Sequence, residues 1–270
     1  MKKLILMMLG LAVVFAACEG SSSADDDLNG GTTTTPDEDE EEEEKVPINE
    51  NFNFGDTLLW HFNGDMEGWE HGNQGDNLDQ NFSEFVTDED GTYIKIYTHP
   101  YTYERQKIRT LDKIYTSGLY EWRVYVPQMG EGDQASIGAF IYNDDTHELD
   151  FEIGYGKSTI RDELGISSST KYMVAYTTSQ ANPAVSTYRK ILTGWHTVGL
   201  DISVVYDLYV TKWLIDDVQV ELQGHTNAFG PKDYMFKIFC SVENLAFLGD
   251  HEPYEMNYAL FDYMMYAYHE

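Results

Sequence analysis

Basic side chains are scarce in this sequence, which has 17 Lys and Arg residues against 47 Asp and Glu residues. Residues 1–45 hold 12 of the acidic and three of the basic side chains, which leaves 35 acidic and 14 basic side chains, a net charge of −21, in the rest. A chain of this sign repels the phosphates of nucleic acids and the head groups of anionic membranes. Both classes of partner are therefore excluded, whereas neutral sugars and cationic ligands remain open.

A hydrophobic run long enough to span a bilayer is also missing. The apolar stretch Leu4–Phe15 is shorter than the roughly 20 residues of a membrane-spanning helix. Two lysines precede it and two alanines follow, which is the order of a signal peptide over residues 1–17. The tetrapeptide Phe15-Ala16-Ala17-Cys18 resembles a bacterial lipobox. We therefore expect a secreted lipoprotein of the outer membrane or cell surface of a bacterium, held to the membrane only through lipid on Cys18; the alternative is an ordinary secretory peptide.

Cysteine is nearly absent, because Cys18 and Cys240 are the only two. Lipidation of Cys18 would leave Cys240 without a partner, so no internal disulfide is expected. Cys240 lies in an apolar run, residues 235–242, where a free cysteine usually behaves as a small buried hydrophobic residue. We interpret it as part of the core.

Apolar side chains are rare between residues 18 and 45, where an unbroken acidic run occupies Asp37–Glu44. Such a segment cannot bury enough apolar surface to fold, and its like charges keep it extended. We interpret it as a disordered tether; the alternative is an acidic tail that binds a metal or a partner. The remaining residues, 46–270, suit a single domain of the larger all-β kind.

No segment shows a sustained helical period, and the domain instead reads as one strand after another. Polar and apolar side chains alternate in residues 93–97, 119–126 and 208–215, which are rich in Tyr, Val, Ile and Trp. Turn-forming residues separate these runs, namely Glu89-Asp90-Gly91, Ser117-Gly118, Asn143-Asp144-Asp145 and Asp216-Asp217. Many short strands with regular turns predict an all-β sandwich or barrel.

Three carboxylates alternate with apolar residues in the stretch Glu148-Leu149-Asp150-Phe151-Glu152-Ile153. Because side chains on a strand alternate between its faces, Glu148, Asp150 and Glu152 point one way and the apolar residues point into the core. Crowded carboxylates raise one another's pKa, which keeps an acid protonated near neutral pH. These three residues are therefore the candidate catalytic groups.

The spacing of the two glutamates fits a known reaction geometry. Four residues of strand place their Cα atoms about 13 Å apart, and side chains that lean together would bring the carboxyl groups to roughly 5 Å. That separation is typical of a retaining glycosidase, whereas an inverting enzyme needs a wider gap for its water. How far the two glutamate side chains lean toward each other decides between the retaining and the inverting mechanism.

Several segments, in the same order, resemble the family 16 glycoside hydrolases, especially their lichenase and xyloglucan-transglycosylase branch. The acidic strand resembles the family's E-I-D-F/I-E signature at every acidic position. The other matching segments are Ile108-Arg109-Thr110, residues 117–127, Ala139-Phe140, residues 194–200, residues 212–218 and residues 259–263. The resemblance thus covers most of the domain.

This resemblance implies a concanavalin A-like jelly-roll sandwich of two curved antiparallel sheets with a sugar cleft. It implies Glu148 as nucleophile, Glu152 as general acid and then base, and Asp150 as the residue that tunes the pair. Glu121 resembles a sugar-binding position, with Arg123 beside it on the same face; a structural ion pair is the alternative for these two.

The resemblance implies no required cofactor. In some members the position of Asp262 binds a structural calcium ion, and a plain surface carboxylate is the alternative here. The sequence also departs from the family pattern. Ile141 and Ile202 replace tryptophans, and Thr146-His147 replaces a Trp-Asp pair. We expect His147 to be structural, because it faces away from Glu148.

Two functions therefore remain open. The first is a retaining endo-glycosidase that hydrolyses a β-glucan-like polysaccharide by double displacement. The second is a carbohydrate-binding lipoprotein on the same fold whose catalysis has decayed. The three carboxylates favour the enzyme, and the lost tryptophans favour the binding protein.

Overall fold

The computed structural model describes residues 52–270, except residue 168, residues 181–183, residue 207 and residues 225–234. The predicted signal peptide, Cys18 and the acidic tether lie outside the described residues, as does the expected start of the domain at residue 46.

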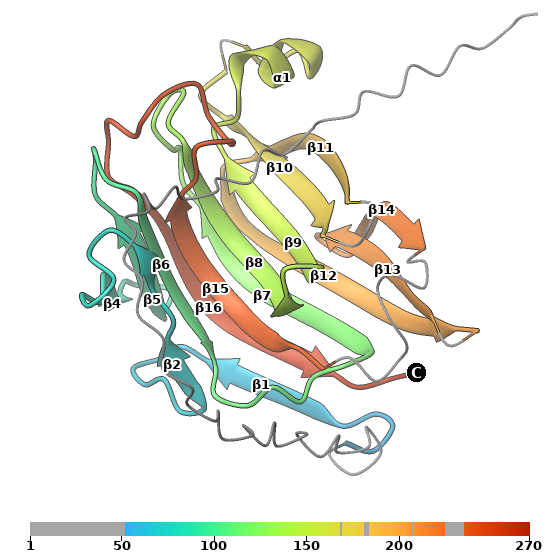
Figure 1. Ribbon diagram of the computed structural model, residues 1–270. Helices are drawn as coiled ribbons and strands as arrows, with labels where there is room; N and C mark the ends of the chain where they lie inside the picture. Colours follow the sequence, from blue (N-terminus) through green and yellow to red (C-terminus); the bar gives the residue numbers. More distant parts are fainter. Residues whose placement is uncertain (1–51, 168, 181–183, 207, 225–234) are drawn as a thin grey trace, which may run out of the picture. The chain divides into compact units, whose positions relative to one another are not determined.

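Two antiparallel sheets of eight strands each make up the fold (Figure 1). The first sheet has the order β14 (Val218–Gly224), β13 (Leu208–Ile215), β12 (Gly194–Val205), β7 (Gly118–Val126), β16 (Asn257–Ala267), β5 (Thr92–Thr98) and β4 (Ser83–Thr87), with β1 (Thr57–His61) beside β16. The second sheet has the order β11 (Val185–Leu192), β10 (Tyr172–Ser179), β9 (His147–Gly154), β8 (Ala135–Asp144), β15 (Lys237–Asn244), β6 (Glu104–Thr110) and β2 (Trp69–His71), with β3 (Gln74–Gly75) beside β6.

Between the sheets lies one core of alternating apolar side chains. In β7, Tyr120, Trp122 and Val124 are fully buried while the residues between them are partly exposed. The Trp122 indole Nε1 donates to the carbonyl oxygen of Phe239 at 3.1 Å. The Trp213 Nε1 donates to that of Asp150 at 3.0 Å. Both bonds reach from the first sheet to the second, so the two tryptophans fix the packing of the layers as well as filling the core.

The turns lie where the sequence predicts them. Asp216 and Asp217 connect β13 to β14 with φ angles of 50° and 62°, the left-handed backbone of a two-residue hairpin loop. Gly118 has φ of 136°, and a Cβ there would lie 2.5 Å from the carbonyl oxygen of Ala267. Cys240 is fully buried, as expected.

The prediction of an all-β jelly-roll sandwich is confirmed. Among the described residues there is one helix, α1 (Ser158–Glu163), and six residues are too few to show a helical period in the sequence. No helix in the described part of the chain is long and apolar enough to cross a membrane.

Candidate active site

The three predicted carboxylates lie on one face of β9, in the middle of the second sheet. Leu149, Phe151 and Ile153 point into the core, and the intervening Glu148, Asp150 and Glu152 point to the outer face of the sheet. We call this outer face the carboxylate face. No register shift interrupts the pairing of β9 with β10, so the alternation is regular over the three acids.

Burial dominates the electrostatics of this trio. It raises the pKa of Glu148 to about 7, while a hydrogen bond with Asp150 opposes that shift. The pKa of Glu152 is raised to about 8, chiefly by burial and also by the charge of Glu148. The pKa of Asp150 lies well above its usual range, because it is buried between two other carboxylates. Near neutral pH Asp150 is therefore protonated.

The floor beside the trio is built by β8 and β15. Phe140 and Phe239 stack with ring centroids 4.5 Å apart and an interplanar angle of 9°, and Phe140 pairs in register with Asp150. Gly138 pairs with Glu152 and leaves the neighbouring position without a side chain. A Cβ on Gly138 would lie 2.3 Å from Ser241 Oγ, so this position of the floor has no room for a side chain.

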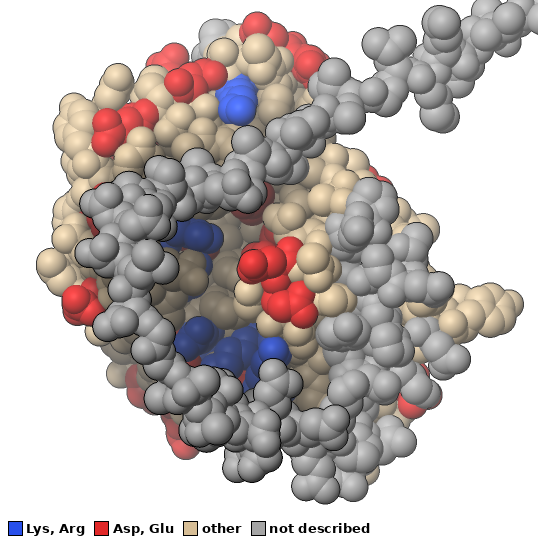
Figure 2. Space-filling model, in the orientation of Figure 1, with Lys and Arg blue, Asp and Glu red and all other residues tan. Residues whose placement is uncertain are grey.

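A row of basic side chains borders the same face on β6. Arg105, Lys107 and Arg109 alternate with core-side residues, and their register across β15 and β8 leads to the acidic strand. Arg105 and Lys107 both contact Glu243, and the Lys107 Nζ lies 3.0 Å from its Oε2. Figure 2 shows Lys and Arg side chains gathered within the hollow of the molecule and a group of acidic side chains facing them.

A fourth basic side chain at this border, Lys237, comes from β15. Arg109 Nε and Lys237 Nζ both contact Glu70 Oε1, at 2.9 Å and 3.1 Å. Our reading of the sequence used Arg109 only as part of a matching segment and did not identify this row. The alternation of basic residues in Glu104–Thr110 was the signal that could have found it.

Glu121 and Arg123 do not join this site. They lie on β7, which belongs to the first sheet, and their side chains point away from the core on the side opposite β9. Tyr263 donates its hydroxyl to Glu121 Oε1 at 2.7 Å, and the Arg123 guanidinium lies over the Trp195 ring at 5.5 Å. Because β7 and β9 belong to different sheets, these two residues do not lie beside the trio, and sugar binding by Glu121 and Arg123 stays a prediction.

The structure also shows where three of the residues that depart from the family 16 pattern lie. Ile141 and Ile202 are fully buried in the core between the sheets, so neither is a position on the carboxylate face. His147 is buried at the start of β9, and its Nδ1 lies 2.6 Å from Asp144 Oδ1. Ile141 and Ile202 therefore remove no aromatic side chain from the face that bears the trio, whereas Thr146, in place of the third tryptophan, is exposed directly before β9.

Asp262 lies at an irregularity of β16, where the pairing with β7 shifts between Phe261 and Tyr263. Its carbonyl oxygen accepts a hydrogen bond from the backbone N–H of Phe62 at 2.9 Å. In the described ranges no group of three or more His, Cys, Asp or Glu side chains could hold a metal ion. A calcium ion at Asp262 therefore stays a prediction.

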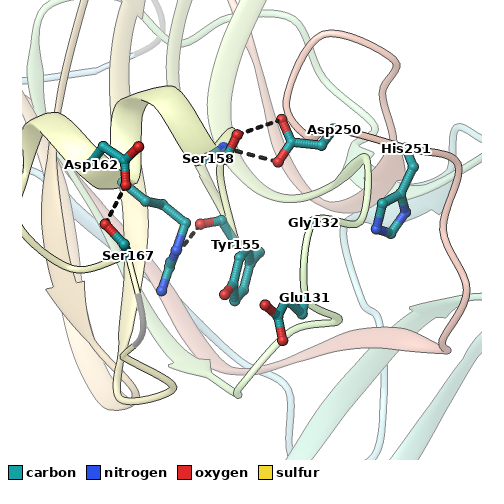
Figure 3. Close-up of a pocket in the computed structure, with 9 residues that line it drawn as sticks. Glu131, Gly132, Tyr155, Ser158, Asp162, Ser167, Asp250 and His251 are labelled. Carbon is teal, nitrogen blue, oxygen red and sulfur yellow. Dashed lines mark hydrogen bonds between the residues drawn. The ribbon is translucent and has the colours of Figure 1, made fainter.

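A polar pocket of about 200 Å³ lies where β9 ends, and Figure 3 shows residues that line it. Asp250 accepts hydrogen bonds from the backbone N–H and the hydroxyl of Ser158, at 3.0 and 3.3 Å. The buried Arg161 lies over the Tyr155 ring and donates to the carbonyl oxygens of Tyr155, Tyr172 and Ile166. This arginine is thus committed to holding α1 and its following loop against the second sheet.

Comparison with known proteins places the fold but not the chemistry. No family model matches the sequence, and no curated protein matches it. A glycoside hydrolase family 16 endo-glucanase from Bacteroides ovatus superimposes with a TM-score of 0.54 at 14% identity, over 77% of this chain and 98% of that one. The Bacillus licheniformis β-glucanase gives 0.52 at 16% identity, over 80% and 100%.

A LamA variant from Z. galactanivorans, in complex with laminaritriose and laminaritetraose, gives a TM-score of 0.55 at 13% identity, over 80% of this chain and 100% of that one. Each of these solved chains is covered almost entirely, so the shared fold extends through the whole sandwich. At such identities the likeness establishes the fold alone, and the function rests on the site.

Proposed function

We propose that this protein is a retaining endo-glycosidase of the family 16 type that hydrolyses a β-glucan-like polysaccharide. One observation carries the proposal: Glu148, Asp150 and Glu152 share one face of β9, where burial raises the pKa of all three carboxyl groups. Two glutamates with raised pKa values on one strand face can hold one ionised and one protonated carboxyl group near neutral pH. Double displacement needs such a pair, a carboxylate nucleophile and a carboxylic acid.

In the first step the Glu148 carboxylate attacks the anomeric carbon and forms a glycosyl ester. The bond from that carbon to the leaving oxygen breaks as Glu152 transfers its proton to this oxygen. The protonated Asp150 donates a hydrogen bond to Glu148, which stabilises the carboxylate form of the nucleophile before the attack.

In the second step Glu152 is a carboxylate and acts as the base. It accepts a proton from a water molecule, whose oxygen attacks the anomeric carbon and displaces Glu148. The product keeps the configuration of the substrate, Glu152 is protonated again and Glu148 is free. Partial burial of both groups strengthens these electrostatic effects, because it reduces the screening by water.

The carbohydrate-binding protein without catalysis is the second candidate. Its support was the loss of three tryptophans, but two of the replacing residues, Ile141 and Ile202, lie in the core, which leaves Thr146 as the one exposed position. Crowding the buried Asp150 between two half-buried glutamates is costly, and a binding surface gains nothing from that cost. The retained trio therefore favours the enzyme.

The β-glucan-like substrate of this proposal is supported by what the solved neighbours act on or bind. The neighbours named above are a glucanase, a β-glucanase and a chain bound to laminarin oligosaccharides. The test is to incubate the domain with barley β-glucan, laminarin, xyloglucan and a galactan and to measure new reducing ends. Proton NMR of the first product then shows whether the anomeric configuration is retained. No release of reducing ends from any member of the panel contradicts the enzyme, and an inverted product contradicts the mechanism.

We also propose that the enzyme is a lipoprotein exported to the bacterial surface, with Cys18 as the lipidated residue. The order of the N-terminal segments supports this: a basic start, a short apolar run, small residues, cysteine and an acidic stretch. Such an anchor would hold the domain near polysaccharides outside the cell.

A further inference from the structure

The basic border of the carboxylate face carries more positive charge than its ion pairs use. We define the cation cluster as Arg105, Lys107, Arg109 and Lys237. These four side chains share two carboxylates, Glu243 and Glu70. Two positive charges therefore remain after pairing, in a chain whose formal net charge is −30.

Pairs of Lys or Arg with carboxylates elsewhere in the described residues do not have this excess. Lys95 pairs with Glu84 at 2.9 Å and Arg189 with Glu221 at 3.5 Å, one Lys or Arg to one carboxylate. Lys212 is the one Lys or Arg paired with Asp201, which also contacts His269. A cluster that served only to hold strands together would need no surplus, since each extra cation on a shared carboxylate adds repulsion. The surplus needs a physical reason beyond packing.

Two members of the cluster are open to a ligand. The side chains of Arg105 and Arg109 are 40% and 38% exposed, whereas that of Lys107 is 5% exposed. Both arginines contact their carboxylates through Nε. Among the hydrogen bonds of the described residues, none occupies the two terminal nitrogens of either guanidinium group. Each therefore presents a pair of parallel donors, the arrangement that binds carboxylate and sulfate-like anions in a bidentate way.

The register places this cluster across the floor from the catalytic trio. Across the strands β6, β15, β8 and β9, one row of paired positions runs from Arg109 to Asp150 through Phe239 and Phe140. The next row runs from Lys107 to Glu152 through Ser241 and Gly138. Three strand spacings of about 4.8 Å separate the ends of each row by about 14 Å. A sugar chain held at the trio can thus direct substituents over the low floor at Gly138 toward the arginines.

We propose that the substrate is a polysaccharide whose sugars carry anionic substituents, sulfate esters or carboxylates, and that Arg105 and Arg109 bind them. This inference rests on the proposed function for the position of the sugar chain. It names a substrate class that the overall acidity of the chain would otherwise exclude, because the cluster reverses the sign of the potential locally. The acidic remainder then repels the same polymer everywhere else, which favours binding in one place.

The test uses one glucan backbone in three forms: unmodified, sulfated and carboxymethylated. Binding to each is measured by isothermal titration calorimetry at 50 and 200 mM NaCl, and cleavage by reducing ends. We expect at least about tenfold tighter binding of one anionic form than of the neutral form, because a charge-assisted hydrogen bond contributes about this factor or more. The preference should shrink at the higher salt concentration.

Matched variants separate the cluster from general charge. Arg105→Gln with Arg109→Gln should remove the preference, while Lys95→Gln, on the other sheet, should leave it unchanged. Arg105→Lys with Arg109→Lys keeps the charges and loses the paired donors, so it should retain a weaker preference. This second double variant provides the test if the glutamine double variant does not fold. Thermal melting of each variant checks that it is folded.

The outcomes distinguish this inference from the proposed function. Binding of the sulfated form alone identifies sulfate as the substituent, and binding of the carboxymethylated form alone identifies a carboxylate. Equal binding of all three forms, or an unchanged preference in both arginine double variants, overturns the inference even if the neutral glucan is cleaved. Arginine-dependent binding without cleavage of any form would keep the inference and reject the enzyme.

Discussion

The hydrogen bond between Asp150 and Glu148 should set the pH profile of the enzyme. Productive molecules have an ionised Glu148 and a protonated Glu152, so kcat/KM should rise as pH increases through about 7 and fall as pH increases through about 8. Replacing Asp150 by alanine removes the donor that lowers the pKa of Glu148. The acid limb of the profile should therefore move to higher pH, toward the basic limb.

The size of this shift follows from the strength of the bond. A hydrogen bond to a charged group contributes about 1.5 kcal/mol or more, which corresponds to about one pKa unit. If the pKa of Glu148 rises by one unit and that of Glu152 stays, the productive fraction at pH 7 falls by about fivefold. The optimum should narrow and move upward, and the loss should be smaller at pH 8 than at pH 7.

The assay is kcat/KM from pH 5 to 10 on the best polysaccharide of the panel, for wild type, Asp150→Ala, Asp150→Asn and Glu84→Ala. Glu84 forms a surface ion pair on the other sheet, so its variant controls for the loss of one carboxylate. Asp150→Asn keeps a donor and should shift less than the alanine variant. An acid limb that stays in place, or moves to lower pH, in a folded Asp150→Ala protein would refute the assigned hydrogen bond.

Three further predictions concern the other parts of the molecule. Glu148→Ala should abolish turnover on every substrate, whereas Glu152→Ala should recover it on an aryl glycoside whose leaving group needs no proton; equal rates for wild type and Glu148→Ala would remove the enzyme proposal. Cys18→Ser should move the protein from the membrane fraction to the soluble fraction, and retention after a high-salt wash would contradict the lipid anchor. Trp213→Phe should lower the free energy of unfolding in urea by about 1–3 kcal/mol, because the buried carbonyl oxygen of Asp150 loses its indole donor; an unchanged midpoint would show that the bond contributes nothing.

Local alternation was enough to predict the acidic strand. Side chains on a strand change face at every residue, so Glu148, Asp150 and Glu152 had to share a face, and Leu149 and Phe151 had to share the other. The turn at Asp216 followed equally from its own residues, because few side chains tolerate its backbone. Such features depend on neighbours in the chain, which the sequence displays directly.

The composition of the cleft was decided only by the tertiary structure. The alternation of Glu121 with Arg123 is as regular as that of Arg105 with Lys107, yet β7 joins one sheet and β6 the other. Strand pairing brings together residues far apart in the chain, as when Glu243 meets Arg105. The choice of partner depends on how all the strands share one core, and that collective choice leaves no mark in the periodicity of a single strand.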